Sequence, residues 1–354
     1  MAIKYISIAK ELSIEMRLMH QAGISKLPSE AELCEKYGCS RQTVRSALSV
    51  LEKKGQIVKK RGSGSYIANL SENFSSEIAV IVPDRNEYIF PEIIRDLQKI
   101  FSDKGYSTRC YNTDGLFLNE RRILRQLLEK PPAGIIIEAQ NNSLPCHNEE
   151  LLKQLEKSDI PVVYLHCAYD YPLNAARVIQ DNYSGAYSLV EHLASKGHKR
   201  IAGIMKCNDT RGVERYGGCV QASLDLGLDF REDNYFWFSS EDRRLLLDNN
   251  DTPLRNFIKY YLGSCTAVIC YNDEIAYHLI QVLSTAGIDV PKKVAVVSFD
   301  NSYYSAIGDV KITSLGHPAH AAGETAAKSL MSLIAGKQVG NILLPWIITE
   351  RDSD

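Results

Sequence analysis

Residues 77–354 alternate between short apolar runs and longer amphipathic stretches, and this alternation restricts the fold more than any other feature of the chain. Runs such as "IAVIVPD", "AGIIIEA", "PVVYLH", "TAVICYN" and "VAVVSFD" have the length of strands and are almost continuously apolar. Strands of this kind are buried on both faces, which indicates parallel sheets covered by helices. The runs form two successive sets, so we predict an α/β body of two doubly wound parallel-sheet lobes.

The body, residues 77–354, is expected to divide into an N-lobe and a C-lobe. The N-lobe is expected to hold residues 77–176 and 316–338, and the C-lobe residues 177–315 and 339–354, with the run "RVIQD" opening the second set. Sheets of this type bind ligands outside the carboxyl ends of their strands. Polar residues stand where the expected strands end, and they are candidates for a ligand site: Asp84, Glu138, His166, Asp181, Lys206, Asn272 and Asp300.

The first 70 residues differ from the body in charge. Residues 1–70 contain 12 lysines and arginines against 6 aspartates and glutamates, a net charge of +6, whereas the remaining 29 basic and 37 acidic residues give −8. A basic head on an acidic body indicates that only the head meets a polyanion. The polar stretch "NLSENFSS" separates the two parts, and we expect a linker at residues 71–76.

The head contains the pattern of a helix-turn-helix. Residues 5–19 carry apolar side chains at helical spacing, and "LPSEAELCEKYG" then offers Ser29 and Glu32 as the capping box of a short helix that ends at Gly38. A further amphipathic helix begins at Ser40 in "CSRQTVRSALSVLEKKG". Two short helices joined by a turn that contains glycine form a helix-turn-helix.

The stretch "KKRGSGSYI" that follows is open to three interpretations: a phosphate-binding loop, a basic hairpin that grips nucleic acid, or an ordinary turn. A P-loop requires G-x-x-x-x-G-K-[ST] followed by a helix, and neither is present. Because it directly follows the helix-turn-helix, we interpret it as the wing of a winged helix-turn-helix, with a glycine tip between two strands. Arginine, glutamine and hydroxyl side chains read base edges or hold phosphates. The expected DNA-binding residues are Ser29, Arg41, Gln42, Thr43, Arg45, Lys60, Arg61, Gly62, Ser63 and Gly64.

The head resembles the N-terminal domain of GntR-type bacterial regulators. The resemblance rests on "LPSE", "CSRQTVR" and the wing "GSGSY", and it covers nearly all of residues 1–70. Many members carry arginine directly after the glutamate of L-P-S-E, where this chain has Ala31. The resemblance therefore implies DNA binding with an altered base preference.

The body resembles the periplasmic-binding-protein-like core of the LacI/GalR repressors. The motifs that carry this resemblance are "DNYSGAYSLVEHLASKGHKRIAGI", "RGVERYGG", "AVICYNDEIAYHLIQVLSTAGIDVPKKVAVVSFDN", "ITSLGHP" and "LLPWIITERDS". A GntR-type head on a LacI-type body is similar to a family of pentose-responsive bacterial repressors. The resemblance implies a sugar-responsive regulator that represses carbohydrate utilisation genes, binds operator DNA as a homodimer and is released by a pentose, with L-arabinose as the first candidate.

The same resemblance implies the residues of the effector site. Arg215 matches an arginine that clamps sugar hydroxyls, and Asn272 and Asp300 match polar sugar contacts. His317 occupies a crossover position that faces the sugar, and His166 stands where the family usually has Asp or Asn. With two aromatic residues as an apolar platform for the sugar ring, the expected effector site comprises Tyr88, Phe90, Glu138, His166, Asp181, Lys206, Arg215, Asn272, Asp300 and His317.

Two alternatives to a sugar-responsive regulator stay open. Doubly wound sheets also host enzymes, but the chain has no G-x-G-x-x-G after a strand, no G-x-S-x-G and no H-E-x-x-H, so we predict no enzyme activity and no cofactor. The cysteines have no zinc-ligand spacing, and we expect no metal. A purine or other non-sugar effector is the second alternative. No signal peptide or membrane-length apolar run is visible, so we expect no membrane partner and a cytoplasmic location.

Overall fold

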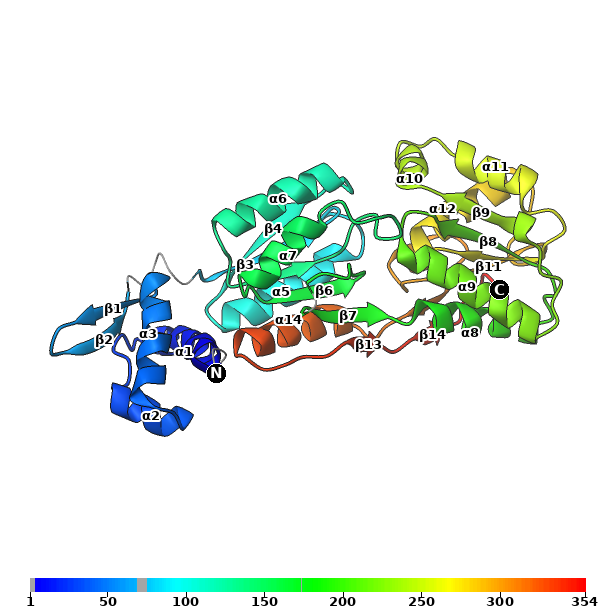
Figure 1. Cartoon of the computed structure of the whole chain (residues 1–354). Coiled ribbons are helices and arrows are strands. Elements are labelled where there is room, and N and C mark those ends of the chain that lie inside the picture. The colour runs from blue at the N-terminus through cyan, green and yellow to red at the C-terminus, as the bar shows by residue number, and fades with distance from the viewer. Residues whose placement is uncertain (1–3, 69–74, 173) are drawn as a thin grey trace.

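The computed structural model describes residues 4–68, 75–172 and 174–354, and it shows a small head followed by two lobes (Figure 1). The head lies beside the first lobe, and the second lobe lies at the far end of the molecule. Of the expected linker, residues 71–76, only residues 75 and 76 belong to the described part of the chain. Across the described ranges, no helix is long and apolar enough to cross a membrane.

The head is a winged helix-turn-helix, as predicted from the sequence. Ser29 caps the second helix: its Oγ accepts the backbone N–H of Glu32 at 3.3 Å, and the Glu32 carboxylate accepts the N–H of Ser29 at 2.7 Å. Ser40 caps the third helix by accepting the N–H of Thr43 at 3.2 Å. The elements are α1 (Lys4–Gln21), α2 (Glu30–Tyr37), α3 (Arg41–Lys53), β1 (Ile57–Lys60) and β2 (Gly64–Ile67).

The wing is the antiparallel pair β1 and β2, with Lys60 opposite Gly64. Gly62 and Gly64 adopt φ angles of 75° and 111°, a region that favours glycine, which explains the Gly-Ser-Gly tip. The chain before α2 joins this sheet, because the N–H of Leu27 donates to the carbonyl of Ser65 at 3.0 Å. The wing is therefore fastened to the helix-turn-helix rather than attached only at its base.

The N-lobe is built around a six-stranded parallel sheet in the order β13-β7-β6-β5-β3-β4. Helices α5 and α14 cover one face and α6 and α7 the other, so apolar side chains fill both sides of the strands. This is the doubly wound arrangement predicted from the continuous apolar runs. The elements are β3 (Glu77–Val82), α5 (Phe90–Asp103), β4 (Ser107–Asn112), α6 (Phe117–Glu129), β5 (Gly134–Ile137), α7 (Glu149–Lys157), β6 (Val162–His166), β7 (Ala176–Gln180), α14 (Ala321–Ile334) and β13 (Ile342–Leu344).

The C-lobe repeats this architecture with the strand order β14-β12-β11-β10-β8-β9, in which β14 alone runs antiparallel to its neighbour. Helices α10, α11 and α12 cover one face and α8 and α9 the other. The elements are α8 (Asn182–Ser195), β8 (Ile201–Lys206), α9 (Thr210–Asp225), η1 (Glu232–Asn234), β9 (Tyr235–Phe238), α10 (Ser240–Leu247), α11 (Thr252–Tyr260), β10 (Ala267–Cys270), α12 (Asp273–Thr285), β11 (Ala295–Phe299), α13 (Tyr304–Ile307), β12 (Thr313–Gly316) and β14 (Ile347–Thr349).

Two strands lie in a different lobe from the one expected. The run "RVIQD" opens the second set in the sequence, yet β7 pairs in parallel with β6 and completes the N-lobe sheet, where Val178 is fully buried. Likewise β13, expected in the C-lobe, pairs with β7. The chain consequently crosses between the lobes three times, after β7, after β12 and after β13. Pairing partners are long-range contacts, and an apolar run does not reveal which sheet will accept it.

Candidate functional site

The start of helix α3 presents polar side chains to solvent. Arg41 and Gln42 are exposed at its first turn, whereas Thr43 is half-buried and hydrogen-bonds through Oγ1 to the Ser40 hydroxyl at 2.8 Å. Arg45 lies one turn further and donates from Nε to the Glu30 carboxylate at 2.9 Å. On the exposed face of α3, Arg41 and Gln42 are available to contact base edges, whereas Arg45 must first break its ion pair with Glu30.

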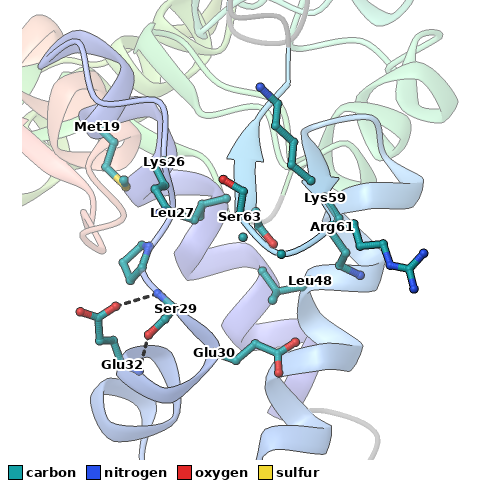
Figure 2. Close-up of a pocket in the computed structure, with 15 residues that line it drawn as sticks. Met19, Lys26, Leu27, Ser29, Glu30, Glu32, Leu48, Lys59, Arg61 and Ser63 are labelled. Carbon is teal, nitrogen blue, oxygen red and sulfur yellow. Dashed lines mark hydrogen bonds between the residues drawn. The ribbon is translucent and has the colours of Figure 1, made fainter.

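The wing carries three further cations. Lys59 forms an ion pair with Glu52 at 2.7 Å, and the Lys60 ammonium lies 4.7 Å from the centre of the Tyr66 ring. Arg61 at the tip is exposed and makes no ion pair with any described residue. Wing and helix-turn-helix together enclose a pocket of about 690 Å³, which Ser29 and Ser63 also line (Figure 2).

A cavity of about 260 Å³ lies between the two lobes of the body, at the carboxyl ends of the parallel strands of both sheets. Sheets of this type bind ligands at this edge, so the cavity lies where the ligand site was predicted from the sequence. Six of the ten expected effector residues line it: Tyr88, Glu138, Lys206, Arg215, Asn272 and Asp300. A cavity of this size is suited to a small molecule rather than to a polymer.

Arg215 and Asp300 form the C-lobe wall of this cavity. The Arg215 guanidinium is buried 3.9 Å above the Phe299 ring, donates from Nε to Asn182 at 3.0 Å and lies 4.0 Å from the Asp300 carboxylate. Asp300 directly follows β11 and has a φ of 98°, a sparsely populated conformation for a residue with a side chain. Such strain persists where the surrounding structure imposes it, which is common at ligand sites.

Charged side chains join the two lobes across the cavity. Arg211 of the C-lobe donates to Glu138 of the N-lobe at 3.0 Å and to Asp209 at 2.7 Å. Burial alone would raise the pKa of both carboxyls, but the Arg211 guanidinium holds the pKa of Glu138 and of Asp209 below its usual value. A second link runs from Arg243 to Glu87 at 3.2 Å. Both carboxylates next to Arg211 are thus kept charged inside the cleft.

Comparison with known proteins identifies both parts of the chain. Residues 5–67 match the bacterial regulatory proteins of the gntR family, and residues 190–353 match a periplasmic binding protein-like domain. The arabinose metabolism transcriptional repressor of Halalkalibacterium halodurans is 31% identical over a segment that covers 87% of this chain and 83% of that protein. The chain belongs to the family of arabinose metabolism transcriptional repressors.

A second relative supports this assignment, and a solved structure shows the same fold. The arabinose metabolism transcriptional repressor of Geobacillus stearothermophilus is 28% identical, with 96% of this chain and 93% of that protein covered. The complex of the transcriptional regulator CelR with cellobiose superimposes with a TM-score of 0.69 at 21% identity, covering 89% of this chain and 92% of that chain, which shows the shared fold. The expected DNA-binding repressor with a GntR-type head and a LacI-type body is confirmed.

Four of the expected effector residues do not line the interlobe cavity. Phe90 is buried in the N-lobe core because it opens α5 on its apolar face. His166 lies behind the cavity wall and hydrogen-bonds through Nδ1 to Glu138 at 2.9 Å. Asp181 and His317 lie on the crossovers between the lobes, where Trp346 donates to the Asp181 carbonyl at 2.6 Å and stacks on the His317 ring at 4.1 Å. Through these contacts with Trp346, Asp181 and His317 connect the crossover segments to one another.

Several cavity residues of this repressor were not expected from its sequence. Four charged residues that line the cavity were not predicted: Glu87, Asp209, Arg211 and Arg243. Asp209 and Arg211 follow the end of β8 by only a few residues, so extending the search from strand ends into the first helical turn would have found them. Arg243 lies on α10 and reaches the cavity through tertiary packing, which no local pattern indicates. Within the described chain, no group of three His, Cys, Asp or Glu side chains is placed to hold a metal ion.

Replacement of Arg45 by alanine should weaken binding to a specific operator by about 1–3 kcal/mol, with relaxed preference at one base pair. The change removes a side chain whose fork fits a guanine edge but which must leave Glu30 to reach it. Fluorescence anisotropy at fixed salt, on an operator selected from random duplexes, measures the loss. Arg255→Ala is the matched control, because Arg255 is an exposed, paired arginine on the C-lobe helix α11. Equal affinities of the Arg45→Ala protein and the wild type would remove Arg45 from the interface.

Proposed function

We propose that this repressor binds a neutral aldopentose, with L-arabinose as the first candidate, in the cavity between its lobes, and that the sugar releases it from operator DNA. We further propose that it acts in the cytoplasm as a homodimer and performs no chemistry on the sugar. The single observation that carries this proposal is the interlobe cavity itself, which is lined from both lobes by hydrogen-bonding side chains.

The chemistry of the cavity supports a polyhydroxylated ligand. Carboxylate, amide and guanidinium groups from Asp300, Asn272 and Arg215 face it, and such groups pair with sugar hydroxyls as acceptors and donors. Two arginines and three carboxylates nearby already form ion pairs with one another, so a charged ligand would have to break an existing ion pair. We therefore assign Arg215, Asn272 and Asp300 as direct contacts, and both relatives described above are arabinose metabolism repressors.

The head supports operator binding by a dimer. One winged helix offers few side chains to base edges, and such domains gain specificity by binding two half-sites related by a two-fold axis. We assign base contacts to Arg41, Gln42 and Arg45 and backbone contacts to the wing, where Arg61 lies at the tip. The Ser29 hydroxyl already caps α2, and the Thr43 hydroxyl is bonded to Ser40, the cap of α3, so both residues contribute by placing helix N-termini near phosphates.

L-arabinose titrated into a preformed protein–operator complex should weaken DNA affinity by about 1–3 kcal/mol, which is roughly 5- to 150-fold. A ligand held by both lobes fixes their relative position, and this changes the placement of heads attached to them. Anisotropy of labelled operator at fixed salt measures the effect. Linkage requires the operator to weaken sugar binding by the same factor, and calorimetry with and without DNA checks this.

Thermal unfolding provides the control for this titration. At roughly 100 times its dissociation constant, a bound sugar should add about 2.7 kcal/mol to the stability of the free protein. A panel of aldopentoses, hexoses and purines should single out the pentoses. A clear thermal shift without any change in DNA affinity contradicts the release mechanism but not the sugar site, whereas no shift with any aldopentose contradicts both.

A further inference from the structure

One N-lobe side chain already occupies the hydrogen-bonding groups assigned to the sugar. Tyr88 lies between β3 and α5, yet its hydroxyl donates to the Asp300 carboxylate of the C-lobe and accepts from the Asn272 amide at 2.9 Å. A single hydroxyl therefore satisfies an acceptor and a donor that face the cavity. A sugar hydroxyl offers the same combination of one donor and two acceptor lone pairs.

We propose that the Tyr88 hydroxyl holds the place of an effector hydroxyl in the ligand-free protein, so that an effector binds by displacing Tyr88 and must present a neutral hydroxyl at that point. This inference rests on the proposed function of the cavity. An ammonium group could donate to Asp300 but could not accept from the Asn272 amide, and a carboxylate or phosphate would be repelled by Asp300. Of these groups, only a hydroxyl replaces both interactions of Tyr88, and it does so through a single atom.

The position of Tyr88 in the fold allows it to leave. It sits on a turn with two local backbone hydrogen bonds, from the N–H of Glu87 to Asp84 at 3.0 Å and from the N–H of Phe90 to Glu87 at 2.8 Å, and the turn is joined to the sheet by the N–H of Arg85, which donates to Asn112 at 3.2 Å. Tyr88 is half-buried and, among the described residues, belongs to none of the buried apolar clusters, whereas Phe90 is 1% exposed in the N-lobe core. Rotation of the Tyr88 side chain thus leaves the core packing intact.

The contact has two effects on ligand binding. Without the Tyr88 contact, Oδ2 of Asp300 and the side-chain N–H of Asn272 would each lose a hydrogen-bond partner, which is unfavourable for buried polar groups. When the Tyr88 contact is formed, the effector cannot bind, so only the fraction of molecules without the contact is competent. The apparent dissociation constant of the effector is therefore the intrinsic constant divided by that fraction. Tyr88 therefore sets the sugar concentration at which the repressor responds.

Tyr88→Phe should bind L-arabinose about tenfold more tightly than the wild type, because phenylalanine keeps the ring but cannot occupy Asp300 and Asn272. Calorimetry on the full chain measures the affinity. Tyr304→Phe is the matched control: its ring packs edge-on against Tyr88 with centroids 5.4 Å apart, and its hydroxyl lies outside the cavity lining. This variant loses the same group one ring away and should bind L-arabinose within about twofold of the wild type.

Circular dichroism and the unfolding midpoint establish that each variant is folded, and Tyr88→Leu repeats the test by removing the hydroxyl with a smaller side chain. Equal or weaker binding by folded Tyr88→Phe and Tyr88→Leu, while the wild type binds L-arabinose, overturns the inference and leaves the proposed function standing. A wild-type protein that binds no aldopentose instead contradicts the proposed function, and this inference with it. Tighter binding by both Tyr304→Phe and Tyr88→Phe would show that loosening of the turn, rather than loss of the Tyr88 hydroxyl, is responsible.

Discussion

A protein with Arg211 replaced by methionine should lose about 3 kcal/mol of stability at neutral pH, or roughly 6–12 °C in the unfolding midpoint of the body. Methionine fills much of the same volume but leaves Glu138 and Asp209 without the guanidinium that both of them contact. Uncompensated charges in a buried site cost far more than exposed ones. Thermal or urea unfolding at pH 7.5 measures the loss.

The stability deficit of the Arg211→Met protein should narrow as the pH is lowered from 7.5 to about 5. In the wild type the pKa values of Glu138 and Asp209 lie below their ordinary values, so the stability from these carboxylates is fully present above that ordinary range and is lost only as pH falls through the folded values. Without Arg211, burial is opposed only by His166 at Glu138 and by Lys206 and Tyr271 at Asp209, so we expect both pKa values to rise and the variant to gain stability as pH falls through them.

Arg255→Met is the control for this experiment. Arg255 of α11 forms an exposed ion pair at 2.8 Å with Asp251, the residue that precedes the helix, and exposed pairs contribute little to stability. Its loss should shift the midpoint only slightly at both pH values. A deficit in the Arg211→Met protein that stays constant with pH would show that lost packing, rather than loss of the cation beside the two carboxylates, causes the destabilisation.

The head could be predicted almost completely from its sequence, because local interactions determine it. Ser29 and Ser40 cap helices through bonds to residues three positions on, and the glycines of the wing adopt the positive φ angles that such a turn demands. What the sequence did not indicate is the pairing of Arg45 with Glu30, since these residues are 15 positions apart and meet only when α2 and α3 pack.

The cleft was predictable in kind but not in detail. The rule that ligands bind at the carboxyl ends of parallel strands correctly placed Glu138, Asn272 and Asp300 around one cavity. It failed for Asp181, because the strand before it leads into a crossover between the lobes, and for His166, which lies behind Glu138; neither placement can be read from an apolar run. The links between lobes, such as Glu87 with Arg243, depend on how the two lobes meet, so the sequence alone could not supply them.

Asp300→Ala should lower the affinity for L-arabinose at least about 100-fold while the folded protein still binds operator DNA in the absence of sugar. Asp300 is held at φ 98° at the end of β11, and its carboxylate is bonded to Tyr88 and lies 4.0 Å from Arg215. Alanine leaves the cation without its facing acceptor, so a sugar hydroxyl gains no strong partner there. Calorimetry measures sugar binding and anisotropy measures operator binding.

The control is Asp309→Ala, which changes an acidic residue of the same lobe outside the cavity lining and should bind sugar normally. Unchanged sugar affinity in the Asp300→Ala protein would exclude Asp300 from the site, whereas loss of both activities would indicate misfolding, which circular dichroism then decides.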